Sequence, residues 1–213
     1  MRRIDKGGQP AAWLRFRKQK PRPRFDECPK EAKEALRAAL LAEQGHLCCY
    51  CMRRIRDEFR GMKIEHWAPR GAHPELDYAN LLAACLGGEG QAAQQQHCDT
   101  AKGDRPISLD PRSPDCERRV RFTPRGEAVA TDRDDRRATE DLSLLNLNLP
   151  RLRAARAAVL EEVHRWATQK GTSRTRRQLE ERVVALETPD GRGRLQSFVG
   201  VATAWLRRQA EKR

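Results

Sequence analysis

Apolar side chains recur every three or four residues in four stretches of the chain, a spacing that predicts four helices. The first stretch follows Pro29, which suits the first turn of a helix, and precedes Gly45, which can adopt the left-handed conformation that ends helices. The other three lie beyond residue 140 and predict a small helical bundle. In order, the apolar positions are Ala32, Leu36, Ala39 and Leu40; Leu152, Ala155, Val159, Leu160, Val163 and Trp166; Leu179, Val183 and Leu186; and Leu195, Phe198, Val199, Ala202 and Trp205.

A second pattern, with a period of two residues, predicts a β-hairpin ahead of the bundle. Val120 and Phe122 alternate with arginines before a turn at residues 124–126, and the chain returns through residues 128–129. The Leu-Asn repeat at residues 145–149 leads into the bundle. Its asparagines are expected to turn or cap the chain, because their side chains readily bond to nearby backbone groups.

The composition is ordinary for a soluble protein. With 213 residues, of which 38% are hydrophobic and 34% charged, the chain has room for one domain with additions or for two small ones. The first residues carry charges without an apolar stretch behind them, and no run of about 18 apolar residues occurs. We therefore expect a cytoplasmic protein.

The charge balance predicts a polyanionic partner. The formal net charge is +13, and basic side chains gain affinity for phosphates by releasing condensed counterions. Nucleic acid, with DNA first, is the expected partner; the alternative is a base-composition bias in the gene that places arginines on solvated faces. Residues 1–24 hold nine basic side chains against the single acid Asp5, and the Pro- and Arg-rich segment 20–24 should be extended. We interpret this region as a basic arm that follows a phosphate backbone.

Seven cysteines without an export signal favour reduced, metal-binding thiolates over disulfides. Two cysteines three residues apart can bind one zinc ion from a tight turn, and a closed tetrahedral site needs a second pair. The proposed structural zinc ligands are Cys48, Cys51, Cys85 and Cys98. Cys49 and His97 remain alternative ligands, whereas Cys28 and Cys116 are expected to be spare.

The cysteine pairs bracket residues that suit phosphodiester hydrolysis, which needs a proton acceptor for water and a cation to neutralise developing charge. His66 can accept the proton, because its ordinary pKa leaves it mostly neutral at pH 7. Glu65 and Asp99 offer oxygen ligands to Mg²⁺ or Mn²⁺. Since neighbouring residues in a strand point to opposite faces, the strand is expected to end or twist at Glu65 and His66, and Pro69 favours an ending.

These residues resemble the HNH endonuclease motif over roughly residues 46–111. The resemblance is carried by Cys48-x-x-Cys51, Ile64-Glu65-His66, Asn80-Leu81-Leu82, Cys85 and Cys98-Asp99-x-x-Lys102-Gly103. It implies an α+β chain with a ββα-metal core, His66 as general base, Asn80 as the brace of the loop that carries it, and Glu65 and Asp99 as ligands of the catalytic Mg²⁺ or Mn²⁺. Asp99 stands where many members have Asn or His. Lys102 is expected to contact substrate phosphate.

Softer motifs are similar to the PtuB family, the HNH nucleases of Septu anti-phage systems, whose relatives accompany some retrons. The similar segments are Met1-Arg2-Arg3-Ile4-x-Lys6-Gly7 with Pro10, Glu43-Gln44-Gly45, Leu76-Asp77-Tyr78-x-Asn80-Leu81-Leu82 and Leu145-Asn146-Leu147-Asn148. This resemblance implies an ABC- or SMC-like ATPase partner, PtuA, and an assembly with several ATPase subunits. The sequence itself contains no phosphate-binding P-loop motif.

The sequence thus predicts an α+β chain in four parts: a basic N-terminal arm and the start of the first helix (1–35), a zinc-stabilised HNH core with a four-cysteine clamp (36–111), a hairpin and connector (112–139), and a helical region that docks the partner (140–213). Two alternatives stay open. One is a standalone restriction-type HNH nuclease, and the other is a zinc-stabilised nucleic-acid-binding scaffold with an inactive site.

Overall fold

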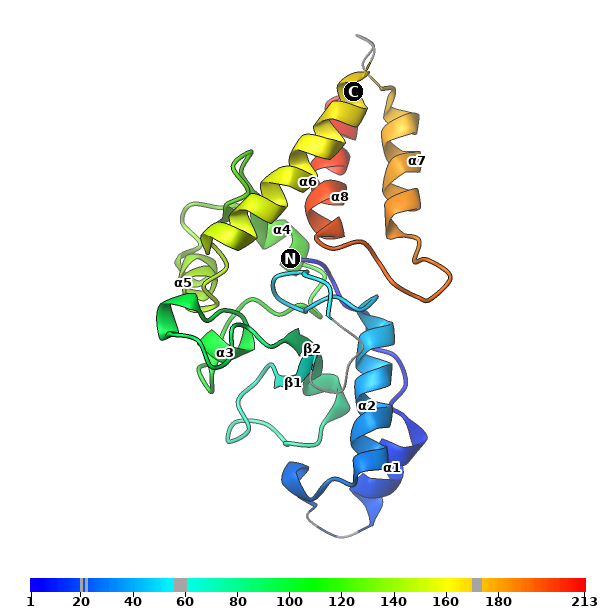
Figure 1. The fold of residues 1–213 in the computed structure, drawn as a ribbon, viewed down its shortest axis with the longest axis vertical. Helices are drawn as coiled ribbons and strands as arrows, with labels where there is room; N and C mark the ends of the chain where they lie inside the picture. Colours follow the sequence, from blue (N-terminus) through cyan, green and yellow to red (C-terminus); the bar gives the residue numbers. More distant parts are fainter. Residues whose placement is uncertain (20, 22, 56–60, 170–173) are drawn as a thin grey trace.

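The computed structural model describes residues 1–19, 21, 23–55, 61–169 and 174–213, and it is a mixed α+β structure dominated by helices (Figure 1). The main helices are α1 (Ala11–Lys18), α2 (Lys30–Glu43), α5 (Arg136–Leu144), α6 (Pro150–Thr168), α7 (Arg176–Glu187) and α8 (Val199–Ala210). The strands are β1 (Met62–His66), β2 (Leu81–Cys85), β3 (Val120–Phe122) and β4 (Ala128–Ala130). Short helical turns are η1 (Phe25–Glu27), η2 (Tyr78–Asn80), η3 (Ala93–Gln95), α3 (Asp99–Lys102) and α4 (Cys116–Arg119).

Two antiparallel hairpins organise the middle of the chain. β1 pairs with β2, with Met62 opposite Cys85 at one end and His66 opposite Leu81 at the other. Every residue of β2 is buried, because α2 packs against this strand. The second hairpin, β3–β4, confirms the alternation predicted from the sequence.

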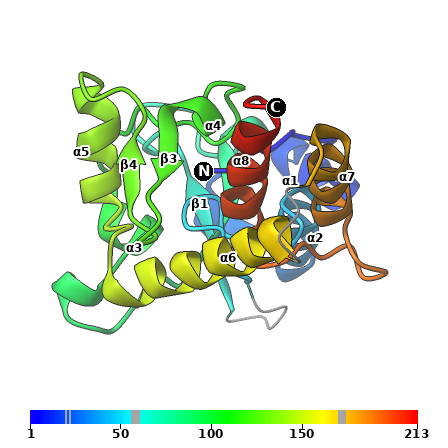
Figure 2. The same cartoon turned by 90° about the horizontal axis from the view of Figure 1, so that it is seen from above.

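The predicted first helix and bundle are confirmed. α2 follows Pro29 and buries Ala32, Leu36 and Leu40, and Gly45 beyond its end has φ +57°. In the bundle, α6 and α7 both pack on α8, and their apolar side chains form a second core cluster (Figures 1 and 2). α8 begins later than the apolar stripe, at Val199, because Phe198 has φ +60° and cannot continue a helix. Helix α5 was not predicted, since its sequence is mostly polar.

The N-terminal segment is not the exposed arm that its charge predicted. Met1 and Ile4 are buried, and α1 places Trp13 and Phe16 in the main core, where Trp13 is 0% exposed. The ring of Trp13 contacts the rings of both Phe16 and Phe25. Basic side chains dominated the composition of this segment, but burial of its few large apolar residues determines where it lies.

Among the residues the structure describes, no helix is long and apolar enough to cross a membrane.

Candidate metal and catalytic site

The first two cysteines of the proposed zinc clamp lie in a tight turn directly after α2. Leu47 pairs with Arg54 as an isolated β-bridge, the backbone N–H of Met52 donates to the carbonyl of Cys48 at 3.0 Å, and Met52 has φ +62°. This reversal brings Cys48 and Cys51 to the same side. The N–H of Cys49 donates to the carbonyl of Ala83 at 3.0 Å, so the turn is attached to β2.

The four predicted zinc ligands meet at one point. The Sγ atoms of Cys48, Cys51, Cys85 and Cys98 all lie within 4.8 Å of one another, and all four side chains are buried. The Sγ atoms of Cys51 and Cys85 are 3.8 Å apart, which is the edge of a tetrahedron of thiolates at about 2.3 Å from a zinc ion. The number, type and spacing of these donors therefore fit a structural zinc ion.

The alternative ligands lie beside this cluster, and neither belongs to the group of four. His97 Nδ1 is 3.0 Å from Cys98 Sγ and 3.9 Å from Cys85 Sγ, where an imidazole N–H can donate to a thiolate. Burial raises the pKa of the Cys49 thiol well above its ordinary value, and the neighbouring Cys48 adds to this rise. The pKa values of Cys51 and Cys98 are also raised, so the positions of the sulfur atoms, and not the pKa, separate Cys49 from the group of four.

Gln44 is a site residue that the sequence analysis did not assign. Its side chain is 1% exposed. Its amide nitrogen donates to the carbonyls of Leu47 and Ala83, at 2.7 and 2.8 Å, and its Oε1 accepts from the N–H of Ala83 at 2.7 Å. Gln44 therefore joins the end of α2, the zinc-binding turn and β2. The Glu43-Gln44-Gly45 segment, which is similar to the PtuB family, was the feature of the sequence that could have identified Gln44.

Glu65 lies at the centre of a buried polar cluster. Its Oε1 accepts from Tyr50 Oη at 2.6 Å and lies 2.9 Å from Lys102 Nζ, and the Glu65 side chain is only 2% exposed. The carboxyl of Asp99 lies within hydrogen-bonding reach of it. Burial raises the pKa of Glu65 well above its ordinary value, and Asp99 adds to this rise while Lys102 and Tyr50 oppose it. Two adjacent carboxylates in a buried place need a proton or a cation between them.

The predicted contact of Lys102 with substrate phosphate does not agree with its position. The Lys102 side chain is 1% exposed, and its Nζ contacts Glu65 Oε1, the carbonyl of His66 at 3.1 Å and the carbonyl of Gly103 at 3.3 Å. An ammonium group has three donors, so these contacts use them all. The spacing from Cys98 correctly brought Lys102 to the site, but the short helix α3 turns it inward against β1.

Lys63 takes the more open position beside Asp99. It lies two residues before Glu65 in β1 and so faces α3 on the same side. Its Nζ is 3.2 Å from Asp99 Oδ2 and 3.2 Å from Thr100 Oγ1, and its side chain is 29% exposed. Asp99 is less exposed than Lys63, with 17% of its side chain accessible to solvent.

His66 is the last residue of β1, and its ring lies on the face of the strand opposite Glu65. Nε2 is 2.9 Å from the carbonyl of Glu75, and the ring packs edge-on against Phe25 at 5.1 Å between centroids. A carbonyl can only accept, so Nε2 carries the proton and Nδ1 is left as an acceptor. Burial lowers the pKa of His66, which keeps the ring neutral. The strand ends here as predicted, but the two side chains still diverge.

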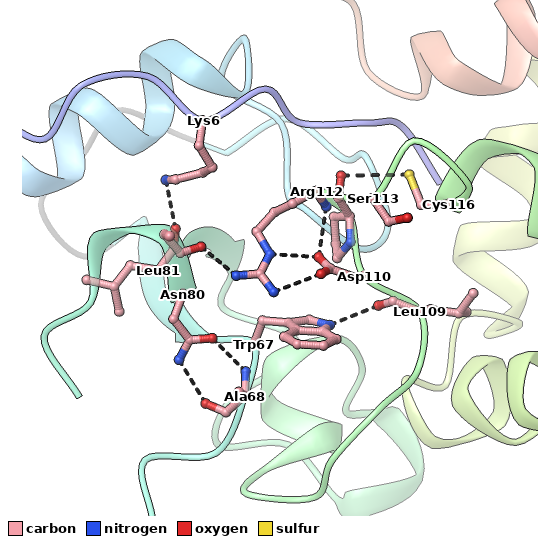
Figure 3. Close-up of polar contacts among 12 residues, drawn as sticks. Lys6, Trp67, Ala68, Asn80, Leu81, Leu109, Asp110, Arg112, Ser113 and Cys116 are labelled. Atoms are coloured by element: carbon pink, nitrogen blue, oxygen red, sulfur yellow. Dashed lines mark hydrogen bonds and ion pairs between the residues drawn. The ribbon is translucent and has the colours of Figure 1, made fainter. Parts of the chain in front are cut away.

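Asn80 holds the backbone that follows His66 (Figure 3). Its Oδ1 accepts from the N–H of Ala68 at 2.8 Å, and its Nδ2 donates to the carbonyl of Ala68 at 3.0 Å. The carbonyl of Asn80 also accepts from the N–H of Trp67 at 3.1 Å. With the Asn80 side chain buried, these three bonds set the path of the loop after β1.

A second brace lies against the same loop. The guanidinium of Arg112 binds both carboxylate oxygens of Asp110 at 2.8 Å, donates to the carbonyl of Ala79 at 2.6 Å and stacks over the ring of Trp67 at 4.5 Å (Figure 3). The indole N–H of Trp67 donates to the carbonyl of Leu109 at 3.1 Å. Arg112 is therefore a supporting residue that the sequence analysis missed, because Trp67 and Ala79 lie far from it in the chain.

The softer sequence motifs also meet near Asn80. Lys6 Nζ is 2.7 Å from Glu43 Oε2, donates to the carbonyl of Leu81 at 3.0 Å and lies over the ring of Tyr78. Glu43 Oε1 accepts from Tyr78 Oη at 2.6 Å and from the N–H of Gly7 at 2.9 Å. Segments that are far apart in the sequence thus hold η2, which ends at Asn80.

Comparison with known proteins finds distant relatives of this chain, two of which are described as HNH endonucleases. No protein-family model matches the chain. It is 30% identical over 99 residues to "Retron Ec83 putative HNH endonuclease" of Escherichia coli, covering 41% of this chain and 38% of that protein. It is 29% identical over 143 residues to "Retron Vc95 putative HNH endonuclease" of Vibrio cholerae serotype O1 biovar El Tor, covering 62% and 66%. It is 34% identical over 55 residues to "Septu protein PtuB" of Bacillus thuringiensis, covering 25% and 21%.

The chain is a distant homologue of these retron proteins and of PtuB. The resemblance predicted from the motifs is therefore confirmed at the level of distant relatives. In each case the chain spans less than two thirds of the relative's length.

Proposed function

We propose that this chain is a metal-dependent HNH endonuclease that hydrolyses nucleic-acid phosphodiester bonds. The observation that carries the proposal is the buried Glu65 carboxylate next to Asp99, with Oε1 fastened by Tyr50 and Lys102. Both fastening contacts use one oxygen, which leaves Oε2 for another partner. The hairpin β1–β2 followed by α3 corresponds to the ββα-metal arrangement expected for an HNH core, with the cysteine cluster holding α3 against the hairpin.

The donor set at Glu65 and Asp99 suits Mg²⁺ or Mn²⁺, because hard cations prefer carboxylate oxygens. Such a cation would neutralise the charge that develops on the phosphate during hydrolysis. His66 accepts the proton of the attacking water at Nδ1, since Nε2 is committed to the Glu75 carbonyl. The scissile phosphate lies beyond the end of β1, where Glu65 and His66 can flank it from opposite faces. Asn80 fixes the loop that follows His66.

The homology to PtuB and to the retron proteins supports a role in anti-phage defence. We further propose that the chain is the nuclease of a complex with an ABC- or SMC-like ATPase resembling PtuA, with DNA as the substrate. The helices α6, α7 and α8 are the proposed docking surface.

Plasmid nicking tests the proposed activity. The zinc-loaded chain, alone and with the co-expressed ATPase, is incubated with supercoiled plasmid and Mg²⁺ or Mn²⁺, beside a His66→Ala variant whose fold and zinc content match the parent. We expect nicking by the parent and a loss of at least about 100-fold in the variant, the usual contribution of a general base. Nicking that persists in His66→Ala would refute the assigned role. No cleavage of DNA or RNA under any condition would favour an inactive scaffold.

A further inference from the structure

A groove with three arginines lies at the zinc end of the β1–β2 hairpin, away from His66. Its volume is about 480 Å³, and Arg53, Arg54 and Arg151 line it together with the backbone of Gly87 and Gly88. Arg53 and Arg54 follow the zinc-binding turn, and Arg151 is the second residue of α6. Elements far apart in the sequence therefore bring three positive charges to one concave surface.

The chemistry of this groove favours a polyanion. No aspartate or glutamate is among the described residues that line it. Arg53 and Arg151 are exposed, and neither forms an ion pair with a carboxylate that the structure describes. Arg151 is held in place by the carbonyl of Gln95, to which it donates at 2.8 Å. Exposed guanidinium groups without acidic partners are suited to bind phosphates.

At the floor of the groove, Gly87 packs closely against the backbone of His97. Gly87 has φ +58°, and a Cβ atom at this position would lie 2.1 Å from the carbonyl oxygen of His97. The N–H of His97 donates in turn to the carbonyl of Gly87 at 2.8 Å. His97 also contacts Cys98 Sγ, which connects the floor of the groove to the cysteine cluster.

Hydrogen bonds connect the lining of the groove to the proposed catalytic residues. Thr100 Oγ1 donates to the carbonyl of Leu86 at 2.9 Å, and Lys63 Nζ contacts both Thr100 and Asp99. From Met62 beside the groove to His66, β1 spans about 13 Å, four residues at about 3.3 Å each. A nucleic-acid strand needs only about four steps of 3.4 Å to cover this distance.

We propose that this groove binds the phosphate backbone of the substrate strand a few nucleotides from the scissile bond, an inference that rests on the proposed nuclease function. The groove arginines position the strand along β1 so that one phosphate reaches Glu65, Asp99 and His66. Arg53 and Arg151 supply the charge, whereas Arg54 is tied to the C-terminal segment through the carbonyl of Leu195 and has a structural part.

Salt-dependent binding tests the groove separately from cleavage. Fluorescence anisotropy of labelled DNA duplex and, in a second series, labelled single-stranded RNA is measured without added divalent cation over a range of salt concentrations. In Arg53→Gln/Arg151→Gln, each lost phosphate contact should lower the slope of log K against log salt by about one, and affinity should fall about 30-fold at about 0.15 M salt. Arg53→Lys/Arg151→Lys, which keeps both charges, should bind nearly as the parent does.

The matched control is Arg136→Gln/Arg137→Gln, which removes two exposed charges from α5. Zinc content and circular dichroism establish that each variant is folded. Equal losses of slope in the groove variant and the control would overturn the proposal, as would a parent chain that binds neither probe. Plasmid nicking is run in parallel. If the parent nicks plasmid and the groove variant binds as the parent does, the groove proposal is rejected and the nuclease proposal is kept. If binding depends on the groove but the parent does not nick, the nuclease proposal is rejected and phosphate binding by the groove is kept.

Discussion

Lys102 Nζ lies 2.9 Å from Glu65 Oε1, and the two side chains are 1% and 2% exposed. A charged pair that is removed from water in this way depends on both partners, because either one alone would be a buried, uncompensated charge. The pair joins β1 to α3, the two elements that carry the proposed catalytic ligands. Lys102 therefore acts on the site by positioning Glu65 and not by binding substrate.

Removing the lysine should destabilise the whole protein. Lys102→Met is expected to lower the free energy of unfolding by about 3–5 kcal/mol, the cost of breaking one side of a buried pair. The control is Lys63→Met, at a half-buried lysine on the same face of β1, where we expect a loss below about 1 kcal/mol. Urea unfolding of the zinc-loaded proteins measures both. Similar losses for the two variants would show that Lys102 is not buried as described.

Zinc content should follow the four-cysteine cluster and not the neighbouring thiol. Cys51→Ser removes one of four ligands and is expected to lose stoichiometric zinc, together with most of the cooperative thermal transition, because metal binding and folding are coupled. Cys49→Ala, which alters the adjacent buried cysteine, should retain one zinc per chain. Metal analysis after gel filtration distinguishes them. Loss of zinc in Cys49→Ala would show that Cys49 is a zinc ligand in place of one of the four proposed cysteines.

The amide of Asn80 has an internal control in Asn148. Asn148 Oδ1 accepts from the N–H of Ala128 at 2.8 Å and its Nδ2 donates to the carbonyl of Ala128 at 2.9 Å, which repeats the clamp of Asn80 on Ala68 far from the catalytic residues. Asn80 is buried and Asn148 is exposed, so Asn80→Ala should lower the free energy of unfolding by about 1–3 kcal/mol and Asn148→Ala should lower it by less. Only Asn80→Ala is expected to slow plasmid nicking strongly under conditions where both variants are folded. Equal activity in the two variants would argue against a role for Asn80 in holding the His66 loop.

Gly87 should tolerate no side chain, in contrast to a nearby glycine of similar backbone conformation. Gly87 and Gly90 have φ +58° and +79°, but a Cβ atom would clash with the His97 carbonyl only at Gly87. We expect Gly90→Ala to cost about 1 kcal/mol, the strain of an L-residue in this region. Gly87→Ala should cost considerably more and weaken zinc binding, because His97 and Cys98 must move. Thermal unfolding and a zinc-chelator competition assay test this difference, and equal effects would contradict it.

Local spacing carried much of the prediction. Helical periodicity identified α2, α6, α7 and α8, because a repeat of three to four apolar residues specifies which face of a helix is buried. The Cys-x-x-Cys pair and the second pair correctly identified the four thiols that cluster, although twelve residues separate Cys85 from Cys98. The resemblance to HNH nucleases identified distant relatives. None of these inferences required knowledge of which segments meet in space.

Tertiary structure decided the environments of these residues. Lys102 is a buried partner of Glu65, the N-terminal segment enters the core through Trp13, and Arg112 braces Trp67. Contacts between distant segments determine which side chains are buried. A buried charge must pair with a protein group, whereas an exposed one can bind a ligand. The sequence by itself determined helices α2, α6, α7 and α8, the metal-binding thiols and the residue types of the candidate site, since these depend on spacing along the chain. Only the fold decided which charges face solvent, which hold one another, and where the groove arginines converge, since these depend on long-range packing.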